Sequence, residues 1–273
     1  MQIIINNLLK TMPMTHEIQQ LMQKLRLPGM RAAYEGIITT KNLNSIGNDE
    51  LLNLILQAEW DERENLKANR RLQNAKFRIR ASMEEIDFFT PRGLDKTQLL
   101  RFADGSFLKH GENILITGLT GVGKSYIATA LGHLACQLGY KVNYFIAQKL
   151  FAMLRMSKAD ESYIRQTKRL EKQDLLIIDD FGMQPLDEMS RMMLLEIIED
   201  RHQNSSTIIA SQLPVDKWYD VIGESTVADA ILDRLVHTSH RIELRTGGER
   251  IGVVGLRGEA IAHGNGISTK VYD

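Results

Sequence analysis

The feature that most limits how this chain can fold is a glycine-rich motif near its middle. Residues 118–125 read GLTGVGKS and fit the pattern G-x-x-x-x-G-K-[ST] at every fixed position. An apolar run, residues 114–117, precedes the motif, and a helical pattern follows it. In such a strand–loop–helix unit, glycines let backbone N–H groups surround a phosphate, and the helix directs the positive end of its dipole at it. The sequence therefore predicts a nucleotide-binding α/β domain.

The residues of this loop have separate expected roles. Lys124 is expected to neutralise the β and γ phosphates, and the hydroxyl of Ser125 is expected to hold Mg²⁺. Contacts with the nucleotide are expected along the whole loop, from Gly118, Leu119, Thr120, Gly121, Val122, Gly123, Lys124 and Ser125.

A second motif supplies two carboxylates. Residues 175–180 read LLIIDD, an apolar run that ends in two acids, as in a Walker B motif. Asp179 at the strand end is expected to orient Mg²⁺ or its water shell, and Asp180 is placed to polarise the attacking water. The alternative is a pair of solvent-facing acids in a turn, which the phosphate loop upstream disfavours.

Further apolar runs predict the rest of a sheet. Short runs that alternate with helical patterns are typical of βαβ units and a mostly parallel sheet. Two polar residues, Ser211 and Gln212, follow the apolar run 208–210. Gln212 is the first candidate for a sensor of the γ-phosphate, and Ser211 is the second. Ordinary strand-end polarity remains the alternative for both. The predicted strands cover residues 114–117, 142–146, 175–178, 208–210 and, more weakly, 242–244.

One arginine is a candidate for action on a neighbouring subunit. Arg234 lies in the amphipathic helical pattern of residues 229–235. An arginine supplied in trans stabilises charge on the transferring phosphoryl group and couples hydrolysis to assembly. An ion pair of Arg234 with Asp233 or another nearby acid is the alternative, and Arg201 is a weaker candidate for the same role.

The N-terminal region differs in character. Residues 15–80 show helical periodicity, and the segment 88–93, FFTPRG, marks a boundary because proline and glycine interrupt regular structure. Residues 63–80 hold seven basic side chains against the single acid Glu64. Such a local excess is expected of a helix or arm that contacts phosphates, although a solvated helix face is the alternative. A second basic stretch, residues 155–172, is diluted by acids and is interpreted as a solvated face.

The composition of the chain excludes several classes of protein. The 273 residues carry 34 basic and 34 acidic side chains, so the overall basic character common in nucleic-acid binders is absent. The single cysteine, Cys136, excludes an intramolecular disulfide framework and fits a reducing compartment. No apolar run approaches the roughly 20 residues of a membrane span. The sequence predicts a soluble cytoplasmic protein in which Cys136, Trp60 and Trp218 are packing residues.

The motifs together resemble a known family. The segments GLTGVGKS, LLIIDDFG, TIIASQLPVDKW and ADAILDRLVHTSHRIEL are similar in order and spacing to those of the IstB-like ATP-binding proteins of bacterial insertion sequences. The similarity covers approximately residues 15–245. These proteins resemble the DnaC helicase loaders and belong to the AAA+ ATPases.

The resemblance implies a fold and three parts. It implies an AAA+ P-loop NTPase core of the α/β class, with a parallel five-stranded sheet, preceded by a small all-α domain. On this basis we expect a helical DNA-binding domain over residues 1–82, an ATPase domain over 83–245 and a loose glycine-rich tail over 246–273. The first 13 residues precede the start near Met14 that the resemblance implies. We expect no helical lid after residue 244, so that nucleotide is held between one subunit and its neighbour.

The resemblance also implies activity and partners. It implies a helper that binds ATP and Mg²⁺, hydrolyses ATP, oligomerises on duplex DNA, and recruits and stimulates a DDE transposase. In this comparison Gln212 falls at the sensor-1 place and Arg234 at the arginine finger. A replicative helicase loader is the second hypothesis, and a small-molecule P-loop kinase is disfavoured because no substrate-binding insertion is evident. The residues that fall where the family meets DNA are Lys67, Arg70, Arg71, Lys76, Arg78 and Arg80.

Overall fold

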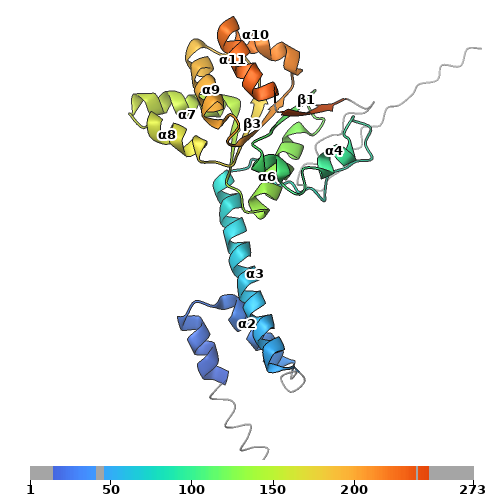
Figure 1. Cartoon of the computed structure of the whole chain (residues 1–273), viewed down its shortest axis with the longest axis vertical. Helices are drawn as coiled ribbons and strands as arrows, with labels where there is room; N and C mark the ends of the chain where they lie inside the picture. Colours follow the sequence, from blue (N-terminus) through green and yellow to red (C-terminus); the bar gives the residue numbers. More distant parts are fainter. Residues whose placement is uncertain (1–14, 41–45, 238, 246–273) are drawn as a thin grey trace, which may run out of the picture.

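The computed structural model describes residues 15–40, 46–237 and 239–245. A long helical arm leads into an α/β unit, and Figure 1 shows the arm projecting away from the sheet. The first 13 residues and the tail 246–273 lie outside the described residues, so the expectations for them stay predictions. In the described part, no helix is both long and apolar enough to cross a membrane.

The α/β unit contains the predicted sheet. All four pairings that join the five strands are parallel, in the order β2-β3-β4-β1-β5, which confirms the predicted parallel five-stranded sheet. Because β4 lies between β1 and β3, the end of β4 separates the phosphate loop from the two acids. The strands are β1 (Asn113–Gly118), β2 (Val142–Ile146), β3 (Leu175–Phe181), β4 (Ser206–Ser211) and β5 (Ser239–Leu244).

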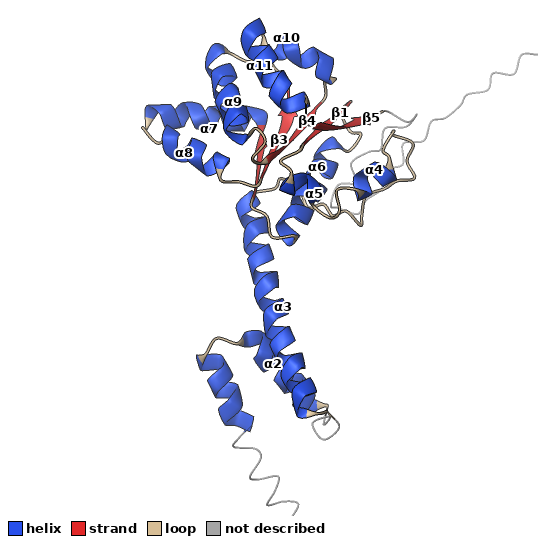
Figure 2. Cartoon of the chain, in the orientation of Figure 1, coloured by secondary structure: helices blue, strands red, loops and turns tan. Residues whose placement is uncertain are grey.

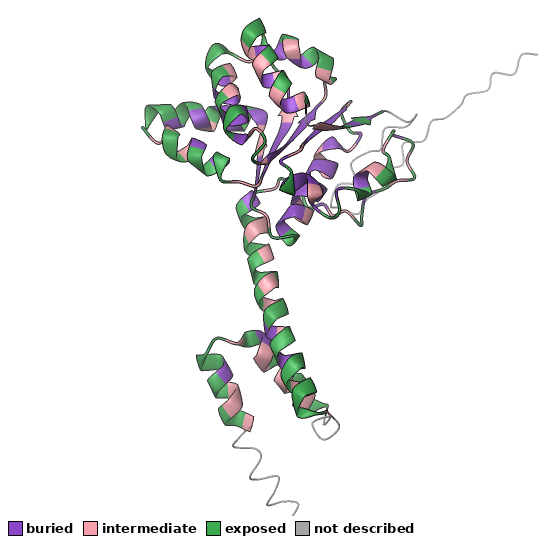
Figure 3. Ribbon diagram, in the orientation of Figure 1, coloured by how far each residue is buried: buried purple, intermediate pink, exposed green. Residues whose placement is uncertain are grey.

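Helices cover both faces of the sheet (Figure 2). Alternate residues of β1 point to opposite faces, so Ile114 and Ile116 enter one apolar core and Leu115 enters the other. Burial on both faces explains why β1, β3 and β4 contain continuous apolar runs, whereas the edge strand β5 alternates buried and exposed residues (Figure 3). The first core includes α4 (Lys96–Leu100), α5 (Ser106–Lys109) and α6 (Lys124–Gln137). The second includes α7 (Ala147–Ala159), α8 (Tyr163–Glu171), α9 (Glu188–Arg201), α10 (Trp218–Ile222) and α11 (Ser225–Val236), with the short 3-10 turn η2 (Val215–Lys217) before α10.

The arm is built from helices, as predicted, although its last helix ends at Ala75 and residues 76–80, predicted as helical, are not. Residues 15–24 are helical, and α2 (Pro28–Thr39) packs on α3 (Asn48–Ala75). The two helices approach so closely at Gly29 that a Cβ there would overlap the carbonyl of Ala58. At 28 residues, α3 is about 42 Å long.

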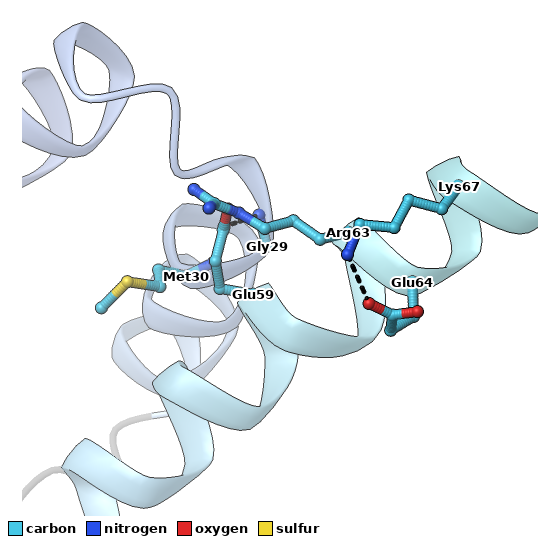
Figure 4. Close-up of polar contacts among 6 residues, drawn as sticks. All are labelled: Gly29, Met30, Glu59, Arg63, Glu64 and Lys67. Atoms are coloured by element: carbon cyan, nitrogen blue, oxygen red, sulfur yellow. Dashed lines mark hydrogen bonds and ion pairs between the residues drawn. The ribbon is translucent and has the colours of Figure 1, made fainter. Parts of the chain in front are cut away.

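A buried carboxylate joins the two helices of the arm (Figure 4). Glu59 of α3 accepts hydrogen bonds from the backbone N–H groups of Gly29, at 2.9 Å, and Met30, at 3.2 Å. These groups belong to the first turn of α2, which has no capping side chain of its own. The guanidinium of Arg63 donates to the other oxygen of Glu59, at 2.7 Å. Glu59 therefore caps α2 from the neighbouring helix.

The C-terminal end of α3 is docked on the α/β unit. Ala75 is fully buried in the first core, and the Arg71 guanidinium lies 3.5 Å from the carbonyl oxygen of Cys136 on α6. Lys76 then adopts a left-handed conformation, with φ of 58°, and ends the helix. The chain leaves α3 at the sheet, beside β2 and α6, and Figure 1 shows α3 meeting the α/β unit at this end.

The packing predictions had mixed outcomes. Cys136 is buried, and burial raises the pKa of its thiol to about 12, so it is an inert packing residue as predicted. Trp218 is fully buried, and its ring lies 5.0 Å from that of Phe181. The prediction for Trp60 was wrong, because this side chain is 64% exposed. The arm is only a helical pair at this point, so the far side of α3 faces solvent.

Candidate nucleotide site

The phosphate loop connects β1 to α6 and depends on glycine at three positions. Gly118, Gly121 and Gly123 have φ of 147°, 86° and 100°, a region that side chains with a Cβ rarely adopt. A Cβ at Gly118 would also overlap the carbonyl of Leu244, so this glycine allows β1 and β5 to pair up to the loop. The sequence pattern is thus required by the backbone itself.

The loop has the properties that a polyphosphate requires. Helix α6 begins at Lys124 without a capping side chain, so its first N–H groups have no side-chain acceptor, and the space around Gly121 is open. The Lys124 ammonium lies within the loop, where it donates to the carbonyl of Leu119 at 2.8 Å. Burial lowers the pKa of Lys124, while the charges of Asp179 and Asp180 oppose this effect. The donors and the cation fit phosphate groups.

Arg92 supports the loop from behind. Its guanidinium donates to the carbonyl of Val122 at 3.0 Å and to that of Asp87 at 2.7 Å. A Cβ on Gly123 would lie 2.5 Å from the same guanidinium, so this glycine also makes room for the arginine. Sequence reasoning missed Arg92, because a single arginine after Pro91 in an irregular segment carries no local signal.

The two acids lie at the end of β3 and differ in environment. Asp179 is fully buried, and its carboxylate accepts from the hydroxyl of Tyr144 at 2.5 Å and from the N–H of Asp180 at 2.9 Å. Asp180 is partly exposed and has a left-handed backbone, with φ of 55°. Burial and then the charge of Asp179 raise the pKa of Asp180, against the opposing charges of Arg78 and Lys124. Tyr144 was also missed, since a tyrosine on a strand is ordinarily a packing residue.

Gln212 lies between the loop and the acids. The hydroxyl of Thr120 donates to the side-chain oxygen of Gln212 at 2.8 Å, so Gln212 contacts the phosphate loop directly. Ser211, the second candidate, is buried, and its hydroxyl donates to the carbonyl of Phe181 at 2.7 Å. The structure therefore places Gln212, and not Ser211, beside the loop.

The structure does not bring the two candidate arginines to the site of their own chain. Arg234 forms an ion pair with Glu199 at 2.7 Å, and its carbonyl lies 3.3 Å from the amide of Asn113 at the start of β1. The loop follows the other end of β1, roughly 17 Å away at the rise of a strand. Arg201 is buried, 2% exposed, and donates to three backbone carbonyls and the hydroxyl of Thr207. A buried, fully engaged Arg201 cannot reach a neighbouring subunit.

The basic run occupies the end of α3 and the segment after it. Of the six residues predicted to meet DNA, five are exposed and Arg71 is partly buried. Lys67 is paired with Glu64 at 2.8 Å, as Figure 4 shows, and Arg78 lies 3.8 Å from Asp180. The basic residues thus extend from the middle of α3 to the acids of the nucleotide site.

Comparisons with known proteins agree with these motifs. A family model described as IstB-like ATP binding protein matches residues 20–252. "Putative insertion sequence ATP-binding protein y4pL" of Sinorhizobium fredii is 42% identical over 231 residues, which cover 85% of this chain and 94% of that protein. "Insertion sequence IS21 putative ATP-binding protein" of Pseudomonas aeruginosa is 27% identical and covers 84% of this chain and 87% of the relative.

A solved structure is similar in fold. The crystal structure of DnaI matches with a TM-score of 0.51 and 21% sequence identity, and covers 64% of this chain and 93% of that one. This similarity concerns the fold, a P-loop NTPase core. Because the family model covers most of the chain and the y4pL relative covers it at high identity, this chain belongs to the family of IstB-like ATP binding proteins.

Proposed function

We propose that this chain is an ATP-dependent helper of transposition that oligomerises on duplex DNA, hydrolyses ATP, and recruits and stimulates a DDE transposase. The observation that carries the proposal is the position of the basic run, which leads along α3 to the acids of the nucleotide site. Nucleotide state and contact with a polyanion can then influence each other. The naming of the relatives as insertion sequence proteins supports transposition as the process.

The chemistry of the site residues supports hydrolysis. Lys124 binds and neutralises phosphate oxygens, while Ser125 and Asp179 would hold Mg²⁺, which supplies further charge neutralisation. A magnesium ion in such sites takes one or two protein ligands and completes its shell with water and phosphate. Asp180 orients and polarises the attacking water, and Gln212 reports on the γ-phosphate through its contact with the loop.

The position of Arg234 supports a role in assembly. This side chain cannot reach the loop of its own chain, so a catalytic role requires a second copy whose loop it faces. Its present partner, Glu199, is on the adjacent helix α9 and is 54% exposed, so the pair is open to exchange. We therefore propose that Arg234 acts in trans within an ATP-dependent oligomer.

Binding of DNA is expected to depend mainly on phosphates. Lys67, Arg70 and Arg80 are exposed lysine and arginine side chains, which neutralise phosphates without reading bases. Low sequence specificity and a steep salt dependence follow. Duplex DNA is the proposed substrate of the basic run.

The first test is binding of the full chain to labelled duplex and single-stranded DNA, with and without ATP. Tight duplex binding that requires ATP, in large complexes to which the purified transposase also binds, is expected. A preference for single strands would instead favour a helicase loader, and no DNA binding at all would favour a remodeller of proteins alone.

Matched variants sharpen this test. Replacing Lys67, Arg70 and Arg80 with Ala is expected to weaken duplex binding equally across sequences and to lower the slope of log K against log salt by roughly 3. Arg71 is left intact because it contacts α6. The control replaces Lys168, Arg169 and Lys172 near the end of α8 with Ala, and this change in the second basic stretch should not alter binding. Equal losses of duplex affinity in the two triple variants would contradict the assignment of DNA binding to the basic run.

A further inference from the structure

The segment that follows α3 is wedged against the nucleotide site. The ring of Phe77 lies 4.6 Å from that of His133 on α6 and 6.1 Å from that of Tyr144 on β2. A Cβ on Gly132 would come within 2.6 Å of the Phe77 ring, so the absence of a side chain at this glycine makes room for it. Phe77 therefore fixes the chain between the helix of the phosphate loop and the edge of the sheet.

This segment is linked to both acids at the end of β3, to Asp180 directly and to Asp179 through Tyr144. Tyr144, whose ring lies near Phe77, donates its hydroxyl proton to Asp179 at 2.5 Å. Arg78, the residue after Phe77, has its guanidinium 3.8 Å from the carboxylate of Asp180. The position of residues 77 and 78 is thus linked to both acids, although α3 belongs to the arm.

The ion pair of Arg78 opposes the role proposed for Asp180. A carboxylate paired with a guanidinium is a weaker hydrogen-bond acceptor and a weaker base toward water, and the Arg78 guanidinium lies 3.8 Å from the carboxylate that water would have to contact. The pair is accessible, because Arg78 is 62% and Asp180 32% exposed. An exposed ion pair is weak, so Arg78 can leave Asp180 for a stronger partner, such as the phosphates of a polyanion.

We propose that Arg78 is a positioning residue that restrains Asp180 in the absence of DNA, and that a duplex DNA phosphate releases Asp180 by drawing Arg78 away. This inference rests on the proposed function, since it assumes that Asp180 orients water and that the basic run meets duplex DNA. It adds a mechanism by which DNA increases ATP hydrolysis. Arg78 then belongs to both surfaces, and its two partners exclude each other.

The test measures ATP turnover, ATP affinity and duplex affinity for the full chain and for Arg78→Ala. Without DNA, Arg78→Ala is expected to raise kcat about two- to five-fold, the range of an exposed ion pair, with KM for ATP unchanged. Stimulation by duplex should fall by the same factor, and duplex affinity should fall modestly. Arg78→Lys keeps the charge and should restore most of the wild-type behaviour.

Two controls separate this role from a general effect of charge. Arg169→Ala on α8 removes an exposed arginine outside the site and should leave turnover with and without DNA unchanged. Salt screens exposed pairs, so the ratio of basal kcat between Arg78→Ala and wild type should approach one as ionic strength rises. A purely structural role for Arg78 would not give this salt dependence.

The outcomes distinguish the two proposals. If duplex neither binds nor stimulates the wild-type chain, the proposed function fails, and the restraint is judged on basal kcat alone. If duplex stimulates the wild type but Arg78→Ala has an unchanged or lower basal kcat, the restraint is overturned and the proposed function stands. If Arg78→Ala has a raised basal kcat but is still stimulated by duplex as strongly as wild type, the proposal that DNA releases Asp180 by drawing Arg78 away is overturned.

Discussion

Removal of the Glu59 carboxylate should detach α2 from α3. In Glu59→Ala, the buried N–H of Gly29 loses its acceptor, which costs about 1–3 kcal/mol for an unsatisfied buried donor. The N–H of Met30 loses the same acceptor, and loss of this second capping hydrogen bond adds about 1 kcal/mol. Arg63 is 54% exposed and is rehydrated, so its lost bond adds little. The helical pair is therefore expected to lose about 2–4 kcal/mol.

Amide hydrogen exchange in α2 measures this loss. A 12-residue helix is not stable alone in water, so protection of α2 reports on its packing against α3. A loss of 2–4 kcal/mol corresponds to protection about 30- to 900-fold lower. Glu64→Ala, on the same helix, removes only the exposed pair with Lys67 and should cost about 0.5 kcal/mol. If both variants change protection of α2 equally, the capping role of Glu59 is refuted.

The same contact predicts a pH dependence. Burial alone would raise the pKa of Glu59, but the hydrogen bonds from Arg63, Met30 and Gly29, with the charge of Arg63, lower it below its ordinary value of 4.5. A carboxyl with a lowered pKa in the folded state contributes stability above its unfolded pKa and loses it as pH falls through the folded one. The difference between wild type and Glu59→Ala should therefore shrink as pH falls below 4.5.

Three further changes test the α/β unit. Arg201→Ala should destabilise it by about 3–5 kcal/mol in denaturant unfolding, because four acceptors, three of them buried, lose their donor at about 1 kcal/mol or more each, and a loss below 1 kcal/mol would contradict this. Gly132→Ala places a methyl group against Phe77 and Ile177. It should lower thermal stability, because the cost of overpacking, about 1–3 kcal/mol, outweighs the gain of about 1 kcal/mol in helix propensity. A raised Tm would show that the Phe77 ring can move aside. Lys124→Ala should weaken binding of a fluorescent ATP analogue about 10- to 150-fold, as expected for a charged hydrogen bond, and undiminished affinity would exclude the phosphate-loop assignment.

The sequence predicted the features that depend on local pattern. Strands β1, β3 and β4 were found because each contains a short apolar run buried on both faces, whereas β5 was a weaker prediction because only Ile242 and Leu244 of it are buried. The loop was found because its glycines have backbone angles that few other residues adopt. Asp179 and Asp180 were found for a related reason, since they follow a buried strand directly. These signals lie within a few residues of one another in the chain.

Contacts between distant segments could not be predicted. Arg92 reaches Val122 across 30 positions, and Tyr144 reaches Asp179 across 35. No periodicity records such pairs, and both residue types are common in ordinary roles. Arg78 was identified only as a basic residue near DNA, because its approach to Asp180 depends on where α3 ends against the sheet.

The contacts of α3 indicate that its two ends have separate structural roles. Glu59 lies in the half of the helix that carries α2, whereas Arg71 and Ala75 lie in the last turns, which pack on the α/β unit. Between these contacts the helix presents exposed side chains such as Leu66, so little besides its own backbone holds it straight. A change at Glu59 should thus alter the helical pair without altering Phe77 and Arg78, which are positioned by α6 and β2. Basal ATP turnover in Glu59→Ala should match that of wild type, and altered turnover would mean that the arm acts on the nucleotide site along the length of α3.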